Sequence, residues 1–430
     1  MIPAEIIAQK RDGNPLSREN MKWFVESFTS GELPESQMAS MLMAIYFNGL
    51  TEDETFALVE VMIASGEKLD FSQTTTPVVD KHSTGGIGDK ISLILAPLLA
   101  SAGLTLPMIA GRSLGHTGGT IDKLEAIPGF QAEVPLPKFK SWVDQIGCAI
   151  IGQTGEICTA DKKMYALRDV TATVQSIPLI CGSIMSKKIA EGINGLVLDV
   201  KTGSGAFMKT MEQAEQLGGW MKKIGTAFDV ETDIVFTSMN QPLGQYAGVW
   251  CEVQESVDCL KDRGPKDTMD VTLALASKLM IQSKKAVDEK EAIAQLNRLI
   301  SNGKAFDKFV EMVEIQGGDS SILEGNPCPP SDTLNFVASK DGIIQSMDTE
   351  KIGWGMVEMG CGRKNPNDLI DFTAGVEFYH KIGSEVKKDE PIARLFNSKK
   401  SGIEKALIQF NDAIVLGDEP QDNKLILGSL

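Results

Sequence analysis

The sequence predicts a fold of class α/β plus α: a helical lobe, an α/β lobe with a mostly parallel sheet, a cleft between the two, and a C-terminal α+β domain. Three observations predict it: apolar residues at helical spacing early in the chain, then short apolar runs alternating with helical segments, and finally short β-like pieces. The expected domains are residues 1–66 with 160–192 (helical), 67–159 with 193–330 (α/β) and 331–430 (C-terminal).

Two stretches of the chain predict the helical domain. Apolar side chains from Met38 to Ile45 recur at helical spacing, and Thr51 with Glu54 matches a capping box ahead of a further helix. Residues 160–192 return to a helical pattern after the first strands. Apolar stripes of this kind are typical of a core, so we expect them to carry no chemistry.

Short apolar runs separated by helical segments predict the strands of the α/β domain. They suit a largely parallel sheet, in which ligands bind at the carboxyl ends of the strands. The expected strands are residues 78–80, 106–110, 149–152, 196–200 and 234–237.

Composition narrows the function classes. A formal net charge of −16 argues against nucleic-acid and membrane partners, which require basic surfaces. Seven cysteines without a Cys-x-x-Cys pair, together with the lack of a signal-peptide pattern, predict a reduced cytoplasmic protein. Because the sequence has only three histidines, a His-rich metal site is not expected.

Two glycine-rich loops each join an apolar run to a helical segment, at residues 81–86 and 111–120. Neither matches a Walker A loop or the Gly-x-Gly-x-x-Gly fingerprint. Two helix N-termini with hydroxyl side chains beside them favour an anion such as phosphate. The alternative is that the glycines only form tight turns.

Basic residues near these loops suggest a local cationic cluster in an acidic chain. Lys81 and His82 follow the first expected strand, and Arg168 and Lys187 lie on the second helical stretch, with Ser183 one turn before Lys187. If the lobes face each other, these groups converge on one anion. The alternative is that Arg168 and Lys187 are solvated surface charges, with Arg168 paired to the aspartate that follows it.

Three long motifs resemble the signatures of the pyrimidine nucleoside phosphorylase family: DKHSTGGIGDK, GRSLGHTGGTIDKLE and ALRDVTATVQSIPLICGSIMSKK. The resemblance spans nearly the whole chain. It implies a homodimer that catalyses reversible phosphorolysis of a pyrimidine nucleoside to the free base and pentose 1-phosphate. It implies no cofactor, since inorganic phosphate is a substrate. The C-terminal β-rich piece resembles a lipoyl-type barrel.

The resemblance also implies which residues form the site, with the α/β domain binding phosphate. Negative charge on the departing base would be stabilised by Arg168 and Lys187, while His82 would donate a proton or a hydrogen bond. These three are the expected catalytic residues. The expected phosphate-binding residues are Lys81, Ser83, Thr84, Ser92 and Thr120, and the expected pyrimidine-binding residues are Leu114, Tyr165, Arg168, Ser183, Lys187 and Phe207.

The chain departs from the family pattern at three places. Ala110 stands where the family has a phosphate-binding serine, and whether Ser113 compensates is open. A lost neutral hydrogen bond of about 1 kcal/mol would weaken phosphate binding several-fold. The broad-specificity branch has a potassium site with a threonine where this chain has Lys90, so the Lys90 ammonium is expected to replace the ion and pair with Glu255. A solvent-facing Lys90 is the alternative.

The third departure is Met108, where the broad-specificity branch has lysine and the deoxyribose-selective branch has methionine. A thioether offers no donor to a 2′-hydroxyl, which favours thymidine over uridine as substrate. A broad-specificity enzyme that accepts uridine is the alternative. More remote alternatives are an anthranilate-type phosphoribosyltransferase, which would need magnesium, and a non-catalytic nucleoside-binding protein.

Overall fold

The computed structural model describes residues 1–113, 115–365 and 368–430. They fall into two compact units. The helical unit comprises Met1–Val78, Gln153–Leu196 and Gln216–Thr232. The α/β unit comprises Val79–Gly152, Val197–Glu215 and Asp233–Leu430, and it includes the C-terminal domain.

The helical unit is a bundle with its own apolar core. Its buried side chains come mainly from the N-terminal helices and are completed by Met164 and Leu167 of α8 and Leu179 of α9. The helices are α1 Pro3–Arg11, α2 Arg18–Ser30, α3 Glu35–Asn48, α4 Glu52–Ala64, α8 Thr159–Val170, α9 Ile177–Ala190 and most of α10 Met211–Ala227.

The capping box expected at the start of α4 is confirmed. Thr51 Oγ1 accepts the Glu54 N–H, and Glu54 Oε2 accepts the Thr51 N–H at 2.8 Å. Glu54 also accepts a hydrogen bond from Lys10 Nζ at 2.8 Å and one from the Leu16 N–H at 2.8 Å. One buried carboxylate therefore ties the start of α4 to α1 and to the segment after it.

The α/β unit is built on parallel strands, and each strand expected from the sequence is present. β2 and β3 pair in parallel, from Leu106 opposite Cys148 to Ala110 opposite Gly152. The other strands form a sheet in the order β1-β4-β5-β13, and the Val79 N–H bridges to the Thr105 carbonyl at 2.8 Å. The strands are β1 Val79–Ser83, β2 Leu106–Ala110, β3 Cys148–Gly152, β4 Gly195–Thr202 and β5 Glu231–Ser238.

The last strand, β13 Ile426–Ser429, was not predicted from the sequence. It pairs antiparallel with β5, with Ile426 opposite Thr237 and Ser429 opposite Val235. The end of the chain thus returns from the C-terminal domain to cover an edge of the α/β sheet. Residues 426–429 give only a short, weakly patterned run, so a tertiary pairing was needed to define this strand.

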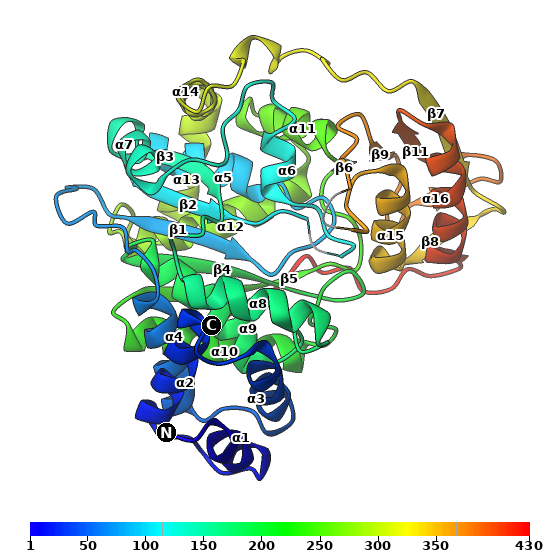
Figure 1. The fold of residues 1–430 in the computed structure, drawn as a ribbon. Helices are drawn as coiled ribbons and strands as arrows, with labels where there is room; N and C mark the ends of the chain where they lie inside the picture. The colour runs from blue at the N-terminus through cyan, green and yellow to red at the C-terminus, as the bar shows by residue number, and fades with distance from the viewer. Residues whose placement is uncertain (114, 366–367) are drawn as a thin grey trace. The chain divides into compact units, whose positions relative to one another are not determined.

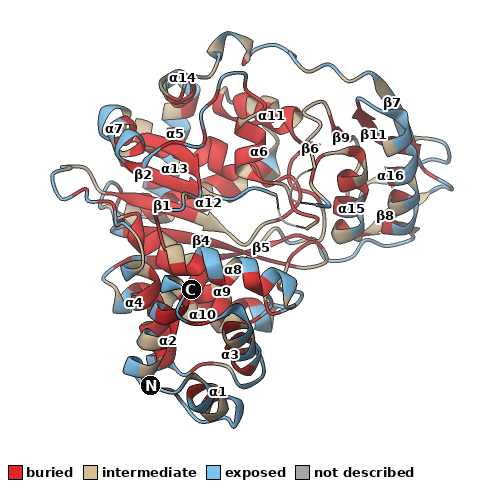
Figure 2. Cartoon of the chain, in the orientation of Figure 1, coloured by how far each residue is buried: buried red, intermediate tan, exposed pale blue. Residues whose placement is uncertain are grey.

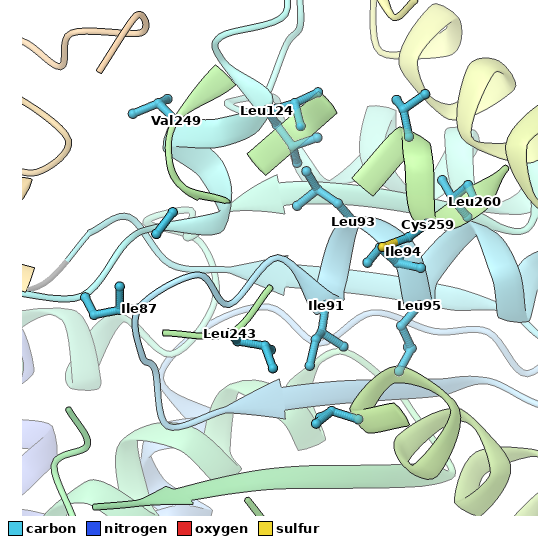
Figure 3. Packing of buried hydrophobic residues seen from close by; sticks show 14 of the residues in the cluster. Ile87, Ile91, Leu93, Ile94, Leu95, Leu124, Leu243, Val249, Cys259 and Leu260 are labelled. Carbon is cyan, nitrogen blue, oxygen red and sulfur yellow. The ribbon is translucent and has the colours of Figure 1, made fainter. Parts of the chain in front are cut away.

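Helix α5 Ile91–Ser101 lies at the centre of the α/β core. Ile91 and every residue from Leu93 to Leu99 are buried, as expected of a helix that is apolar all round. Figure 3 shows its side chains packed among those of neighbouring helices and loops, including Leu124, Cys259 and Leu260. The other helices of this part are α6 Thr120–Leu124, α7 Leu136–Ile146, α11 Trp250–Leu260, α12 Lys266–Gln282, α13 Glu289–Ser301, α14 Lys304–Ile315 and the 3-10 turn Ser320–Ile322.

The C-terminal domain contains two antiparallel sheets and a pair of packed helices, α15 and α16 (Figure 1). Its larger sheet has the strand order β6-β9-β11-β7. The first of these strands, β6, comes from the part of the chain that was expected to belong to the α/β domain. The lipoyl-type barrel stays a prediction. The elements are β6 Tyr246–Gly248, β7 Asp332–Val337, β8 Gly342–Met347, α15 Thr349–Met359, β9 Gly375–Phe378, β10 Glu385–Val386, β11 Pro391–Asn397, α16 Lys400–Ala413 and β12 Ile414–Gly417.

The predicted fold class is confirmed: a helical bundle, an α/β domain with parallel strands and a C-terminal domain with antiparallel sheets. Figure 2 shows strands β1, β4 and β5 as mostly buried, whereas the helix surfaces are partly exposed. Among the residues that the structure describes, no helix is long and apolar enough to cross a membrane.

Candidate active site

At the first glycine loop, two of the expected phosphate-binding residues lie beside the carboxylate of Asp89, and a third lies beside Lys81. Ser83 Oγ donates to Asp89 Oδ2 at 2.6 Å, and Lys81 Nζ lies 3.7 Å from Asp89 Oδ1. Lys81 Nζ also lies 3.4 Å from Ser92 Oγ, in the first turn of α5. The geometry therefore brings Lys81, Ser83 and Ser92 together, as expected.

A second buried lysine, Lys201, lies beside this group. Its Nζ is 2.7 Å from Asp199 Oδ2 and 3.8 Å from Asp89 Oδ2. The Lys201 N–H donates to Thr84 Oγ1 at 2.9 Å, and the Thr84 N–H donates to the Asp199 carbonyl at 3.1 Å. Thr84 is thus fixed to β4, and its hydroxyl is engaged by the backbone.

A third lysine, Lys123 of α6, contacts the residues that follow the first glycine loop. Lys123 Nζ donates to the Asp89 carbonyl at 2.7 Å and lies 2.6 Å from Glu252 Oε2. Thr120 begins the same helix, which ends at Leu124. The charged groups alternate in sign, so the site holds several buried ions near a single loop.

Burial and neighbouring charges shift the pKa values of this cluster in opposite directions. Burial lowers the pKa of Lys81, and its attraction to Asp89 and Asp199 does not offset the shift. Burial alone would raise the pKa of Asp89, but Lys201 and Lys81 outweigh it and hold that pKa well below the usual range. Asp89 is therefore an ionised acceptor, and an anion bound beside Lys81 would counter the lowering of its pKa and stabilise its ammonium form.

Lys90 lies at the N-cap of α5 and is fully buried, so the solvent-facing alternative is wrong. Its Nζ donates to the Leu243 carbonyl at 3.1 Å, the Tyr246 carbonyl at 3.0 Å and Glu255 Oε1 at 3.4 Å. Gly244 has φ +79°, and a Cβ there would lie 2.5 Å from Lys90 Nζ. Only glycine lets this backbone approach the ammonium so closely.

The charge state of the Lys90–Glu255 pair follows from its hydrogen bonds. Burial raises the pKa of Glu255, whereas the attraction of Glu255 and Glu252 outweighs burial and raises the pKa of Lys90. The Glu255 carboxylate also accepts the Gln245 N–H at 3.0 Å and the Tyr246 N–H at 2.5 Å. These donors stabilise the ionised form, so the pair consists of an ammonium and a carboxylate.

The second glycine loop and the helix after it are hydrogen-bonded to Arg363 of the C-terminal domain. Arg363 Nη1 donates to Asp122 Oδ1 at 2.7 Å and to Ser113 Oγ at 3.3 Å, and the Ser113 N–H donates to Asp122 Oδ2 at 2.7 Å. The Ser113 hydroxyl oxygen is therefore an acceptor for Arg363. Ala110 ends β2 and has no hydroxyl to offer. Leu114 lies outside the described residues.

Phe207, expected beside the base, lies in a loop that the C-terminal domain also supports. Its ring centroid is 6.1 Å from that of His116, which lies 6.1 Å from that of Trp354 in α15. Ser204 Oγ donates to the Met347 carbonyl at 3.1 Å and accepts the Thr349 N–H at 3.1 Å. The start of α15 thus fixes the backbone that carries Phe207.

The helical unit contains the other expected group, with Arg168 at its centre. Arg168 is 1% exposed, so the hypothesis of a solvated surface charge is wrong for this residue. Its guanidinium donates to the carbonyls of Thr173 (3.4 Å), Val174 (2.7 Å) and Leu179 (3.1 Å). These bonds use one hydrogen on each nitrogen, which leaves the second hydrogen of each Nη for a ligand.

Tyr165 lies one turn before Arg168, with the guanidinium carbon 5.5 Å from its ring centroid. Burial lowers the pKa of Arg168 and raises the pKa of Tyr165. An arginine has such a high intrinsic pKa that it stays protonated here. The pair offers an aromatic face beside a fixed cation.

Lys187 and Ser183 lie one turn apart on α9, and the structure joins them through a residue that the sequence analysis missed. Lys187 Nζ donates to Ser183 Oγ at 2.9 Å and to Asp161 Oδ2 at 2.5 Å. Ser183 Oγ donates to the same Asp161 oxygen at 2.9 Å. The Lys187 side chain is 15% exposed, so it is largely enclosed.

The expected residues therefore form two groups, one in each unit. Arg168, Ser183 and Lys187 belong to the helical unit, whereas Lys81 and His82 belong to the α/β unit. The convergence of the two groups on one substrate stays a prediction. His82 is half-buried at the end of β1.

Family models match all three regions of the chain. Residues 4–66 match the helical bundle domain of a glycosyl transferase family, residues 75–306 match its a/b domain, and residues 343–417 match the pyrimidine nucleoside phosphorylase C-terminal domain. The chain belongs to the pyrimidine nucleoside phosphorylase family. The resemblance predicted from the motifs is confirmed.

Curated relatives of the family agree with this placement. The chain is 43% identical over 424 residues to a pyrimidine-nucleoside phosphorylase of Staphylococcus epidermidis, covering 98% of each chain. It is 42% identical over 403 residues to one of Staphylococcus haemolyticus, covering 93% of each. Anthranilate phosphoribosyltransferase from Thermus thermophilus matches with a TM-score of 0.58 and 17% identity, over 72% of this chain and 99% of that one, which shows a shared fold.

Sequence reasoning missed the residues that organise each group. Asp89 and Lys201 carry the charge around the first loop, and Asp161 joins Ser183 to Lys187. Asp89 stands inside the motif that resembles the family, so its position was a usable signal. Asp161 precedes Arg168 by two helical turns, a spacing that any surface aspartate could have.

Proposed function

We propose that this protein catalyses reversible phosphorolysis of pyrimidine nucleosides to the free base and a pentose 1-phosphate. The observation that carries the proposal is the burial of Arg168 with Lys187 in one unit, and of Lys81 with serine hydroxyls in the other, within a chain of net charge −16. Buried cations with hydrogen atoms left for a ligand suit a substrate that becomes negatively charged.

The base would leave as an anion, and cleavage of the glycosidic bond would leave positive charge on the sugar. Arg168 and Lys187 would donate to the carbonyl oxygens of the base, and their attraction grows as negative charge develops there. His82 would donate a proton or a hydrogen bond to one of these oxygens. Tyr165 and Phe207 would provide apolar walls around the ring.

Phosphate would bind at the first glycine loop, where Lys81 is a buried ammonium beside Ser83 and Ser92. Held below the anomeric carbon, it is positioned to attack and also neutralises the cationic sugar. Ser83 now donates to Asp89, so it would have to turn its hydroxyl to the phosphate. Thr84 and Thr120 would complete the binding groups.

The test is release of free base, followed by ultraviolet absorbance with and without phosphate. Thymidine and uridine should both be assayed, and release should require phosphate. Lys187→Met should lower kcat/KM by roughly 10²–10³-fold, because a donor to the developing anion is lost. Lys162→Met, an exposed lysine of α8, is the matched control and should leave activity unchanged. Release that needs magnesium and pyrophosphate, or binding without turnover, would contradict the proposal.

We propose a preference for 2′-deoxynucleosides, that is, thymidine over uridine. Met108 lies on β2 opposite Ile150, is 1% exposed and offers no hydrogen-bond donor to a 2′-hydroxyl. Met108→Lys should raise the kcat/KM ratio of uridine to thymidine. Equal kcat/KM for the two nucleosides in the native protein would instead indicate the broad-specificity alternative.

We propose that the Lys90 ammonium occupies the place of the potassium ion found in the broad-specificity branch. It donates to two backbone carbonyls and to Glu255, a set of oxygens of the kind that binds a monovalent cation. The protein would then work without potassium and without a cofactor.

We further propose that the protein is a cytoplasmic homodimer. On α3, Met43, Tyr46 and Phe47 are exposed, and Phe47 is 76% exposed. Tyr46 and Phe47 form an edge-to-face pair with ring centroids 5.6 Å apart. An aromatic pair on an open helix face suits contact with a second copy of the chain. All seven cysteines are free thiols, in keeping with a reducing compartment.

A further inference from the structure

Asp161 is a buried carboxylate in the first turn of α8, and it is bound to two residues expected to hold the base. Its Oδ2 accepts from Lys187 Nζ at 2.5 Å and from Ser183 Oγ at 2.9 Å. Lys187 Nζ also donates to Ser183 Oγ at 2.9 Å, which closes a triangle of three side chains. Each member therefore restrains the other two.

The chemistry of the three groups fixes the direction of every hydrogen in this triangle. An ammonium can only donate, and an ionised carboxylate can only accept. The Ser183 hydroxyl must then donate its single hydrogen to Asp161 while one of its lone pairs accepts from Lys187. What remains for a ligand is one N–H of Lys187 and one lone pair of Ser183, side by side.

A donor beside an acceptor matches one edge of uracil and thymine. Each of these bases carries a carbonyl oxygen next to the N3–H, so the carbonyl can accept from Lys187 and the N3–H can donate to Ser183. Cytosine has an unprotonated N3, which would place a lone pair against the lone pair of Ser183. A site with a fixed acceptor rejects a ligand that cannot donate to it.

The cost of keeping Asp161 buried also argues for a role in binding. Its Oδ1 atom has no hydrogen-bond partner among the described residues. A buried carboxylate oxygen without a hydrogen bond is unfavourable for folding, so its presence calls for an explanation, and a role in the site supplies one.

We propose that Asp161 is a positioning residue that orients Lys187 and sets the direction of the Ser183 hydroxyl, so that the site accepts uracil and thymine and rejects cytosine. The inference rests on the proposed function, because it takes Ser183 and Lys187 to face the base. Asp161 itself need not touch the substrate.

The experiment measures binding of free thymine and free cytosine by calorimetry, together with phosphorolysis of thymidine and 2′-deoxycytidine. The native protein should bind thymine at least roughly tenfold more tightly than cytosine. Asp161→Asn should weaken thymine binding and narrow that ratio, since an amide can either donate to Ser183 or accept from it. Asp169→Asn, an exposed aspartate of the same helix, is the matched control and should leave the ratio unchanged.

A purely structural role would lower binding of both bases by the same factor, and that result would overturn the proposal. So would equal affinity of the native protein for the two bases. If Asp161→Asn does not fold, the single variant Lys187→Met is compared with the double variant that carries both Asp161→Asn and Lys187→Met. In the double variant both members of the buried ion pair are neutral, so neither is left as an unpaired charge. The double variant should have a smaller ratio of thymine to cytosine affinity than Lys187→Met alone, because only the single variant keeps the Asp161 carboxylate that fixes the Ser183 hydrogen. Equal ratios in the two variants would overturn the proposal.

These measurements separate the inference from the function on which it rests. Thymine binding without any phosphorolysis by the native protein would contradict the proposed activity, while the binding ratio would still decide the role of Asp161. Active native protein with an unchanged ratio in Asp161→Asn would contradict only the role of Asp161.

Discussion

Lys81 and Lys90 are both buried lysines of the α/β unit, yet their surroundings shift their pKa values in opposite directions. Burial lowers the pKa of Lys81 and outweighs the attraction of the Asp89 carboxylate, which lies 3.7 Å from its Nζ. Lys90 has Glu255 and two carbonyls around it, and its pKa is raised. The first ammonium is available to an incoming anion, whereas the second is already neutralised.

The lowered pKa of Lys81 predicts a pH dependence. If the charged ammonium binds phosphate, kcat/KM for phosphate should fall at alkaline pH with an apparent pKa below the ordinary lysine value of about 10.4. At saturating phosphate the same limb should move to higher pH, because the bound anion stabilises the ammonium. A pH profile of initial rates checks both. A limb at or above the ordinary value would contradict the assignment.

The environment of Lys90 predicts that a variant lacking this lysine would be stabilised by potassium. Lys90→Thr should destabilise the protein by about 3–5 kcal/mol, because Glu255 is left buried without its cation. Thermal unfolding in potassium chloride should recover part of this loss, whereas sodium chloride should not. Lys188→Thr breaks another buried ion pair, with Glu191, and should show no such recovery. Native activity that depends strongly on potassium would contradict the replacement of the ion by Lys90.

At the scale of secondary-structure elements, the capping box of α4 shows how one carboxylate joins several segments. Burial works to raise the pKa of Glu54, but hydrogen bonds from the Leu16 N–H and Lys10 outweigh it and lower that pKa. A lowered carboxyl pKa means that the group stabilises the fold above its unfolded pKa and ceases to do so as the pH falls through its folded value.

Glu54→Gln should therefore lower the free energy of unfolding by about 1–3 kcal/mol at pH 7, since the buried Lys10 loses its counter-charge. The difference from the native protein should shrink as the pH falls below the ordinary Glu value of about 4.3. Urea unfolding between pH 7 and pH 3 measures it. Glu52→Gln, in the same turn but exposed, is the control. A difference that stays constant over this pH range would contradict the account.

Sequence periodicity located most elements but not their partners. Strands β1 to β5 were expected because short apolar runs bounded by glycine-rich loops are local signals. β13 was not, because residues 426–429 become a strand only by pairing with β5. The start of α15 fixes the loop that carries Phe207 through Ser204, a contact that no pattern within either segment predicts.

At the scale of the whole molecule, the exposed aromatic pair of α3 predicts the state of assembly. The native protein should sediment as a dimer, and Phe47→Glu should shift it to the monomer, because a charge would be buried in the contact. Ile408→Glu, a change at another exposed apolar residue on α16, should leave the dimer intact. Sedimentation velocity compares the three proteins. A native monomer, or a dimer unaffected by Phe47→Glu, would contradict the predicted interface.

The sequence alone determined the family and the fold class and predicted most of the candidate site residues, because motifs, helical periodicity and strand-loop-helix patterns depend on near neighbours in the chain. Only the tertiary structure decided how these residues are held. Lys90 meets Glu255 across 165 positions and Arg363 meets Ser113 across 250. Burial and hydrogen-bond partners are supplied by distant segments, and these set the charge and direction of each side chain.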